Sequence, residues 1–145
     1  MKSFRILLLC LSPFAFLASA TAADKGHGEH HGAAAGLTKE QRKFLSNYEG
    51  VRAALASDDL AAAKRSAANL SGSSAAGEIA KATSLEVARE SFKKLSTEAV
   101  ALAKGQEGYY VATCPMARAD WVQTSPAISN PYYGKSMLTC GSIKN

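Results

Sequence analysis

Four sulfur-bearing side chains lie close together near the C-terminus of the chain. Cys114 and Met116 flank a proline, and Met137 and Cys140 follow the aromatic turn at 130–134. Thiolate and thioether ligands are soft and select Cu(I) over hard cations. Residues two apart on an extended chain share a face, and so do residues three apart on a helical turn. The sequence therefore predicts that these four residues form a soft-metal site, with Cu(I) as the expected ion.

The N-terminal segment predicts export. Lys2 and Arg5 precede an uncharged apolar run, and small residues follow it, which is the layout of a cleaved signal peptide over residues 1–23. The apolar run is too short to span a bilayer, and no later stretch is long and uncharged enough. We therefore expect a periplasmic protein with no integral membrane segment after cleavage. Cleavage leaves about 122 residues with a net charge of about +3, which suits one small domain.

In an exported protein the two remaining cysteines have a structural alternative. A Cys114–Cys140 disulfide would contribute about 3 kcal/mol in the chain-entropy model. Methionines commonly fill gaps in hydrophobic cores. A thiolate pair that binds metal can also oxidise when the metal is absent, so the metal site and the disulfide both stay open. In either case we expect aromatic residues around the cysteines, as core side chains or, in a minor alternative, in a cation–π contact with copper: Tyr109, Tyr110, Trp121, Tyr132 and Tyr133.

All three histidines precede the domain in a segment rich in glycine and alanine. His27, His30 and His31 lie within residues 24–36, whose composition provides no packing surface, so we expect a flexible tail. Neutral imidazoles are ligands for Cu(II) and Zn(II). The tail is therefore either a second, weaker metal site or a linker that happens to be rich in histidine.

Hydrophobic spacing predicts a mainly α domain over residues 37–145. Thr38 and Gln41 form a capping box at the start of a helix over residues 39–56, whose apolar residues recur on one face. A second helix is predicted over residues 60–70. Its short connection to the first, and the many alanines on both, favour close antiparallel packing in an up-and-down bundle of three to four helices.

The second half of the domain is predicted to change from helical to irregular structure. After a short turn around Ile79, a capping box of Thr83 and Glu86 is expected to begin the longest helix, which ends at Gly105. Residues 109–113 are aromatic and β-branched and should be extended. The remainder is predicted to be an irregular, aromatic-rich C-terminal segment.

The helical charges predict neither an enzyme nor a nucleic-acid-binding protein. Glu86 and Glu90 have basic neighbours and are expected to form solvent-facing pairs, and Glu49, Asp58 and Arg89 are expected to be ordinary solvated charges. The basic residues form no stripe of the kind that binds nucleic acids. No serine or cysteine has a histidine partner in a structured segment, so we expect no catalytic site. A thiol oxidoreductase usually needs an activated cysteine or a Cys-x-x-Cys motif, which a spacing of twenty-six residues does not supply.

Several short stretches carry a resemblance to a known family. They are residues 48–55, 88–92 and 95–96, the stretch from Tyr110 to Met116, Trp121, residues 130–134, Met137-Leu138 and Cys140-Gly141. On these residues, positions 44–143 resemble a bacterial domain family of unknown function, found as small exported proteins and appended to periplasmic adaptor subunits of heavy-metal efflux systems. The Cys-Pro-Met piece also resembles a heavy-metal-binding motif that reads Cys-Pro-Met-His-Pro, with Ala117 here in place of the histidine. The resemblance implies periplasmic metal binding or association with an efflux system.

The sequence thus predicts a periplasmic copper-binding protein that acts in metal buffering, resistance or hand-over to a heavy-metal efflux adaptor. The alternative is a non-catalytic protein-interaction domain, stabilised by a disulfide, that docks on a cell-envelope complex.

Deleting residues 24–36 tests the histidine tail. Neutral imidazoles bind metal and protonated ones do not, so weak Cu(II) or Zn(II) binding should fade as the pH falls through about 6 to 7. The deletion should abolish this binding and leave the thermal midpoint unchanged, because the tail has no apolar stripe to add to the core. Calorimetric titration and thermal unfolding measure both, and a large drop in stability would contradict the prediction.

Overall fold

A side-chain cap begins each of the four helices in the computed structural model, which describes residues 36–144. Thr38 caps α1 (Lys39–Ala56): its Oγ1 accepts from the Gln41 N–H at 3.2 Å, and the Gln41 side chain accepts from the Thr38 N–H at 2.8 Å. This confirms the predicted capping box. Asp59, Ser73 and Ser84 cap α2 (Leu60–Ala68), α3 (Ser74–Lys81) and α4 (Leu85–Ala103). The predicted signal peptide and histidine-rich tail lie outside the described residues, apart from Gly36.

Two details of the predicted helices are wrong. The segment around Ile79 is the helix α3 rather than a short turn, because the Ser73 hydroxyl accepts from the Ala76 N–H at 3.3 Å and begins a helix that buries Ile79. The cap of α4 is Ser84 and not Thr83. Ser84 has extended backbone angles, and its Oγ accepts from the Val87 N–H at 3.3 Å. The first difference arises because a serine read as part of a helix break is a helix cap, and the second because two neighbouring hydroxyl residues are both competent caps.

The C-terminal segment contains a sheet, so the prediction of an irregular segment is wrong. The expected extended stretch is β1 (Tyr110–Cys114), which pairs antiparallel with β2 (Ala119–Gln123) and with β3 (Ser142–Ile143) in the order β2-β1-β3. The chain reverses between β1 and β2 through a turn in which the Arg118 N–H donates to the Pro115 carbonyl at 3.3 Å. Arg118 has φ 49, in the left-handed region that such tight reversals use. The mainly helical fold is confirmed, with the sheet as an added element.

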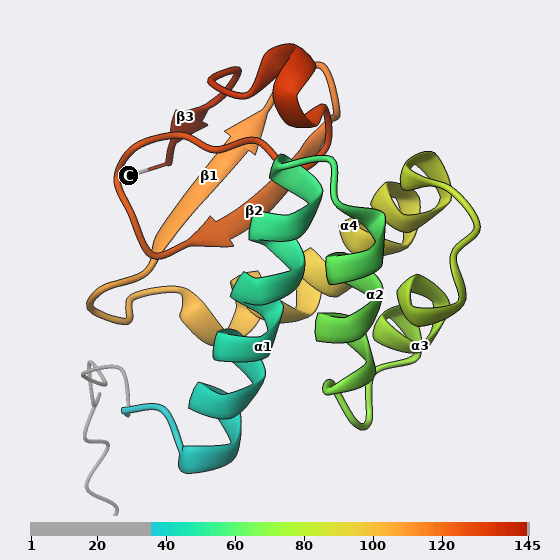
Figure 1. The fold of residues 1–145 in the computed structure, drawn as a ribbon. Coiled ribbons are helices and arrows are strands. Elements are labelled where there is room, and N and C mark those ends of the chain that lie inside the picture. Colours follow the sequence, from blue (N-terminus) through green and yellow to red (C-terminus); the bar gives the residue numbers. More distant parts are fainter. Residues whose placement is uncertain (1–35, 145) are drawn as a thin grey trace, which may run out of the picture. The chain divides into compact units, whose positions relative to one another are not determined.

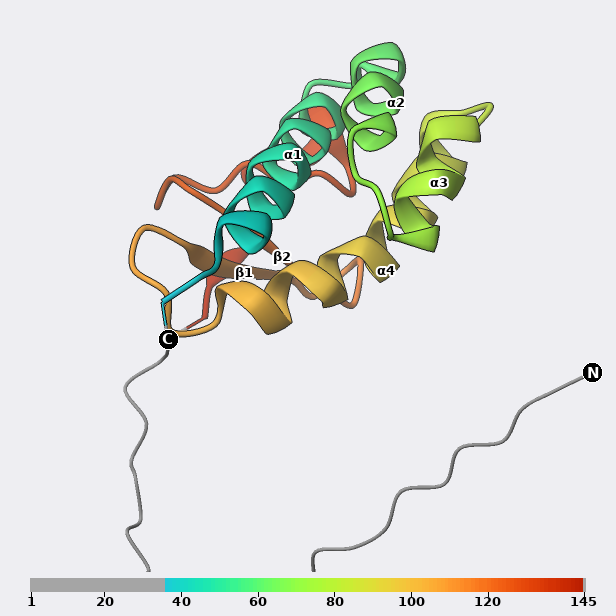
Figure 2. The same cartoon turned by 90° about the horizontal axis from the view of Figure 1, so that it is seen from below.

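Aromatic packing joins the sheet to the helices. In Figures 1 and 2, α2 and α3 lie on one side of α1, and the sheet lies on the other. Tyr48 of α1 stacks on Phe92 of α4 with ring centroids 5.2 Å apart, and Tyr132 packs against both Phe92 and Trp121 of β2. Trp121, Tyr48 and Phe92 are the largest fully buried side chains. Within residues 36–144, none of the helices combines the length and apolar character needed to cross a bilayer.

Two tyrosine hydroxyls cover the free edge of β2. The Val122 N–H donates to Tyr48 Oη at 3.1 Å, and Tyr132 Oη donates to the Asp120 carbonyl oxygen at 2.5 Å. Tyr48 Oη also bonds the buried Ser96 hydroxyl at 2.9 Å, and burial raises the pKa of Tyr48, so the hydroxyl stays protonated. An uncovered edge strand would leave these backbone groups unpaired. The tyrosines therefore fix β2 against α1 and α4.

Replacing Tyr48 with Phe tests this role. Y48F keeps the ring stacking but leaves the buried Val122 N–H and Ser96 hydroxyl without their partner, so the free energy of unfolding should fall by about 1–3 kcal/mol. Urea unfolding measures the change. The partly exposed Tyr133 is the matched control, and Y133F should change stability by no more than about 0.5 kcal/mol. Equal effects of the two variants would contradict the assigned role.

Candidate functional site

The two cysteines of the described domain lie together. Cys114 ends β1, and Cys140 lies between the short 3₁₀ helix η1 (Gly134–Met137) and β3. Their Sγ atoms are 3.8 Å apart, and both thiols are free. Cys114 is fully buried, whereas Cys140 is partly exposed. The fold thus forms a thiol pair from residues that are distant in sequence. That these residues are metal ligands stays a prediction.

Pairing of β1 with β3 brings Cys140 to Cys114. Thr113 pairs with Ser142 in antiparallel register, so Cys140, two residues before that pair, lies at the end of β1. Gly141 has φ 138, and a Cβ added there would lie 2.7 Å from the Thr113 carbonyl oxygen. Only glycine fits such a position without a backbone shift. The Cys-Gly dipeptide therefore allows the close approach of the two strands beside the thiols.

Asn130 is a fully buried residue that connects the segments carrying the cysteines. Its Nδ2 donates to the Cys140 carbonyl oxygen at 2.7 Å, and its Oδ1 accepts from the Tyr132 N–H at 2.8 Å. Its backbone N–H donates to the Leu138 carbonyl oxygen at 2.7 Å. The side chain also hydrogen-bonds Cys114. Since a side-chain amide carries two donor hydrogens, Asn130 can hold the Cys140 backbone and the Cys114 sulfur together.

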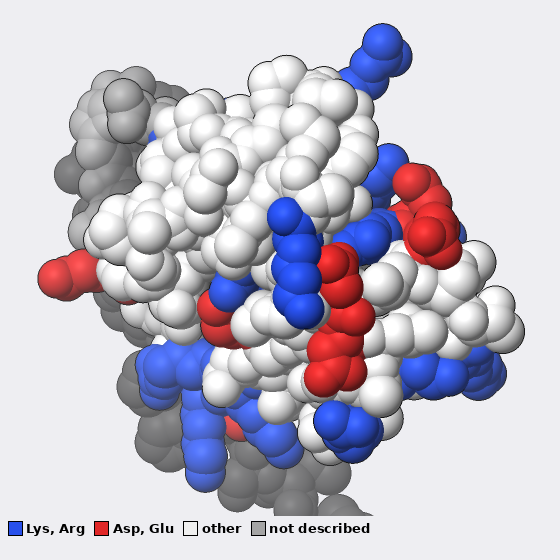
Figure 3. All heavy atoms as spheres, turned by 45° about the horizontal axis from the view of Figure 1, so that its top comes forward, with Lys and Arg blue, Asp and Glu red and all other residues white. Residues whose placement is uncertain are grey.

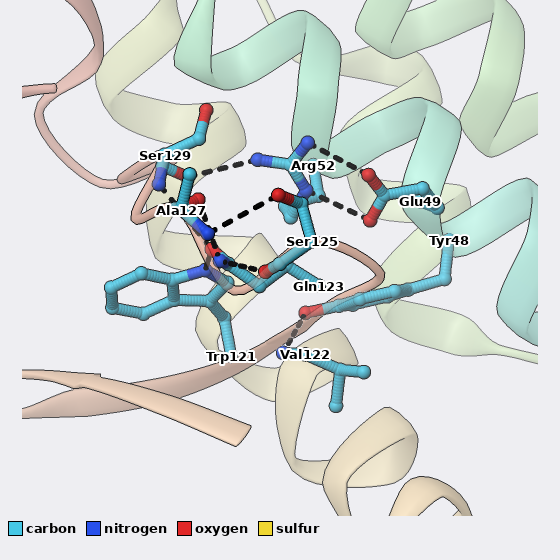
Figure 4. Close-up of polar contacts among 9 residues, drawn as sticks. All are labelled: Tyr48, Glu49, Arg52, Trp121, Val122, Gln123, Ser125, Ala127 and Ser129. Atoms are coloured by element: carbon cyan, nitrogen blue, oxygen red, sulfur yellow. Dashed lines mark hydrogen bonds and ion pairs between the residues drawn. The ribbon is translucent and has the colours of Figure 1, made fainter. Parts of the chain in front are cut away.

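A buried glutamine organises the loop that runs from β2 towards the site (Figure 4). Gln123 Oε1 accepts from Trp121 Nε1 at 2.9 Å and from the Ser129 N–H at 3.3 Å. Its Nε2 donates to the carbonyl oxygens of Ser125 and Ala127, at 2.5 and 2.8 Å. One side chain therefore satisfies backbone groups along the whole loop and orders it over Trp121.

Arg52 of α1 holds the end of that loop. Its Nη1 donates to the Ser129 carbonyl oxygen at 2.8 Å, while its Nε and Nη2 donate to the Glu49 carboxylate at 2.8 and 2.7 Å (Figure 4). The Arg52 side chain is only 9% exposed. The bidentate carboxylate offsets the cost of burying the guanidinium and leaves Nη1 free to donate to the loop.

Arg89 of α4 binds the carbonyl of Pro131, two residues after the Ser129 carbonyl that Arg52 binds. Its Nε donates to the Pro131 carbonyl oxygen at 2.9 Å, and its Nη2 donates to the Leu55 carbonyl oxygen at 3.0 Å and to Asp58 Oδ1 at 2.5 Å. Asp58 Oδ2 in turn accepts from the Lys135 N–H at 3.2 Å. The hydrogen bond from Arg89 holds the pKa of Asp58 below its usual value. We call Arg52 and Arg89 the arginine clamp, because they fix the carbonyls on both sides of Asn130.

The two thiols have different electrostatic environments. Burial raises the pKa of Cys114, but hydrogen bonds from the Ala117 N–H at 3.5 Å and from Asn130, Cys140 and the Met116 N–H together lower it below its usual value. The hydrogen bond to Cys114 and burial raise the pKa of Cys140. Cys114 is therefore the sulfur that carries negative charge first, with the Cys140 S–H as its donor.

The methionines lie in different surroundings from the thiol pair. Met116 lies in the turn after β1, is 58% exposed, and lines a hollow of about 370 Å³ together with Arg89 and Tyr133. Met137 is the last residue of η1 and partly buried, and its carbonyl oxygen accepts from the Cys140 N–H at 3.0 Å. The described contacts join the two thiols to each other. Convergence of all four sulfurs stays a prediction.

The predicted aromatic surroundings are only partly correct. Trp121 lies against Gly141, where an added Cβ would be 2.7 Å from its ring, and meets Tyr132 edge-on with centroids 5.9 Å apart. Tyr109 and Tyr110 instead lie at the other end of β1, where they line a separate hollow beside α4. A strand of five residues spans about 13 Å, which separates these two rings from the cysteines.

The residues that position the thiols could not be identified from the sequence. Asp58 and Arg89 were expected to be ordinary solvated charges, and this is wrong because Arg89 binds the Pro131 carbonyl 42 residues away and Asp58 binds the Lys135 N–H 77 residues away. Glu49, also expected to be ordinary, pairs with Arg52 three residues along the same helix. The solvent-facing role expected for Glu90 is confirmed by its exposed pair with Lys93 at 2.8 Å. The one feature of the sequence that could have indicated the arginine clamp is that each arginine lies next to the apolar stripe of its helix.

Within residues 36–144, no three side chains of the His, Cys, Asp and Glu types converge on one point. His27, His30 and His31 lie outside the described residues. The comparisons gave no match to a family model, a curated protein or a solved structure. The resemblance to the efflux-associated domain family therefore stays a prediction, and function has to be argued from the thiol pair.

Replacing Gly134 with Ala tests whether η1 has to pack closely against Asp58 and Arg89. It has φ 59, and an added Cβ would lie within 2.8 Å of the Asp58 carboxylate carbon and closer still to Asp58 Oδ1 and Arg89 Nη2. G134A should therefore lower the free energy of unfolding by about 2 kcal/mol or more.

Gly77 provides the matched control in urea unfolding of the same domain. It is an exposed helical residue of α3 with nothing within 4 Å of an added Cβ. G77A should raise stability by about 0.5–1 kcal/mol, since alanine is the better helix former. A neutral G134A would show that Asp58 and Arg89 do not require the close approach of η1.

Proposed function

We propose that this chain is an exported soft-metal-binding protein that takes Cu(I) as cargo at Cys114 and Cys140 and buffers it or hands it on to an efflux system. One observation carries the proposal, the 3.8 Å separation of the two free sulfurs. Two thiolates that bind one tetrahedral ion at about 2.3 Å lie about 3.8 Å apart, so the reduced pair is already spaced as one edge of a thiolate metal site.

The electrostatics of the pair suit a soft cation. A metal-binding thiol must lose its proton, and the lowered pKa of Cys114 makes one thiolate available at little cost. A bound cation then assists loss of the second proton, from Cys140. Thiolate ligands favour Cu(I) and Zn(II) over hard cations, and added thioethers shift the preference towards Cu(I).

Further ligands would come from the methionines. Met116 has a mobile, unbranched and exposed side chain two residues from Cys114, and Met137 is tied through its carbonyl to the Cys140 backbone. Either thioether would complete a three-coordinate sulfur site. An incomplete set in the metal-free protein suits a carrier, which must release its ion to the next protein.

Release of the metal requires access from solvent, and the partly exposed Cys140 provides it.

Between Trp121 and Ile143 the only charged residue is Lys135. Figure 3 shows a broad uncharged area on the end of the molecule where η1 lies. Such a surface suits docking of a partner without a charge penalty. The resemblance to efflux-associated domains makes a heavy-metal efflux adaptor the proposed recipient, and the histidine tail the proposed second site.

The second candidate is a non-catalytic interaction domain with a permanent Cys114–Cys140 disulfide, docked on an envelope complex through the same uncharged area. The proximity of the sulfurs favours it as well. It differs in requiring a closed disulfide that does not open in the folded protein.

Competition titration of the reduced, metal-free protein against a colorimetric Cu(I) chelator tests the proposal. The wild type should bind about one Cu(I) at the thiol pair. The variant with both Cys114→Ser and Cys140→Ser should lose more than the roughly 100-fold in affinity that outer-shell changes cost. The exposed neighbour Thr139 gives the matched control, T139S, which should bind as the wild type does. Equal Cu(I) retention by the double variant would refute the site.

Alkylation of the folded protein separates the two candidates. A carrier should expose two reactive thiols after treatment with a mild reductant and protect both when Cu(I) is added, as counted by mass spectrometry. A permanent bridge should resist the reductant until the domain unfolds. Two thiols that stay unreactive in every folded condition would favour the interaction domain.

A further inference from the structure

We propose that the thiol pair also performs thiol–disulfide exchange with small-molecule disulfides in a fixed order, in which Cys140 reacts first and Cys114 resolves the mixed disulfide. This activity belongs to the metal-free protein and does not depend on the proposed metal function. It concerns the class of reaction that the pair undergoes and the role of each sulfur in it.

Access sets the order. Cys114 has no exposed surface and lies beneath the turn after β1, where the Ala117 N–H donates to its sulfur at 3.5 Å. Cys140 lies in the segment between η1 and β3 and is partly exposed. An incoming disulfide must place its sulfur in line with the attacking sulfur. Only Cys140 offers that approach from solvent in the folded domain.

Geometry provides the second step. The sulfurs are 3.8 Å apart, and a disulfide bond is about 2.05 Å long, so closure needs an approach of under about 2 Å. Both backbone polar groups of Cys140 are hydrogen-bonded. Its N–H donates to the Met137 carbonyl oxygen at 3.0 Å, and its carbonyl oxygen accepts from Asn130 Nδ2 at 2.7 Å. Side-chain rotation must therefore make most of this approach. The short, preset distance favours internal attack over a second external thiol.

The chemistry balances with one disulfide as the oxidant. The Cys114 thiolate first takes the proton of the Cys140 thiol, whose sulfur lies 3.8 Å away. The Cys140 thiolate then attacks one sulfur of a disulfide RSSR, forming Cys140–S–SR and releasing RS⁻, which takes the proton from Cys114. The Cys114 thiolate then attacks the Cys140 sulfur, forming the Cys114–Cys140 bond and releasing the second RS⁻. The protein loses two electrons and two protons, and one RSSR becomes two RSH. The reverse sequence reduces the bridge with two small thiols.

Single-cysteine variants distinguish the two roles. Metal-free, reduced C114S and C140S are treated with oxidised glutathione in the presence of a chelator, and intact masses are followed with time. C114S should accumulate one glutathione adduct, because Cys140 attacks the glutathione disulfide and no second cysteine then resolves the mixed disulfide. C140S should react at least about tenfold more slowly, because Cys114 is covered by the fold. The wild type should lose two hydrogens without accumulating an adduct.

Unfolding supplies the control. In denaturant, C114S and C140S should react at the same rate, since burial no longer separates them. Near-UV circular dichroism checks that each variant is folded. If either is not, a brief exposure of the folded wild type to limiting maleimide, followed by peptide mapping, makes the same comparison, and the label should lie on Cys140.

Two results would overturn the inference. One is equal reactivity of folded C140S and C114S, or a maleimide label on Cys114. The other is persistence of the glutathione adduct on the wild type, which would mean that Cys114 does not resolve it. Failure of the Cu(I) titration with normal exchange would reject the metal function alone, and the reverse pair of results would reject only the exchange.

Discussion

The architecture of the site depends on two guanidinium groups, Arg52 buried and Arg89 half-buried, that hold backbone carbonyls on either side of Asn130. Arg52 and Arg89 come from the two long helices. Glu49 of α1 neutralises Arg52, and Asp58 of the turn between α1 and α2 neutralises Arg89. Removing one partner of either pair would leave a partly buried charge without its counter-ion, which destabilises the fold. The clamp therefore fixes the turn at Asn130 against α1 and α4, although the turn itself has no regular secondary structure.

From the clamp, the positioning runs through Asn130 to the sulfurs. Asn130 binds the Cys140 carbonyl and hydrogen-bonds Cys114, so the spacing of the two sulfurs is set by a side chain that is itself fixed by α1 and α4. The strand pairing sets the same spacing from the other side, through the register of β1 with β3. Two independent constraints thus act on one distance. Because the cysteines lie at a strand end and in a loop, two constraints hold the distance between their sulfurs more firmly than one would.

The sequence predicted those parts of the fold that depend on local signals. The capping box and apolar stripe defined the bounds of α1, and β-branched residues indicated β1. The sheet was missed because β2 and β3 are stabilised by pairing and by the Tyr48 and Tyr132 hydroxyls, none of which is a local signal. The cysteines were recognisable by type, whereas Asn130 and the clamp arginines were not. Their roles come from partners tens of residues away, and spacing along the chain carries no record of these.

The resting distance between the sulfurs bears on how metal binding and oxidation compete. At 3.8 Å the reduced pair already has the separation of two thiolates on one metal ion, whereas a disulfide requires the sulfurs to come nearer by more than about 1.5 Å. The clamp and Asn130 hold the Cys140 backbone in place, so side-chain rotation has to bring the sulfurs together for a disulfide to form. A disulfide uses the same two sulfurs and removes both ligands at once. Any condition that oxidises the pair therefore empties the proposed Cu(I) site, and metal bound to both thiolates protects them from exchange. The two proposed chemistries would therefore compete for the same sulfurs, with the outcome set by the supply of metal relative to small-molecule disulfide.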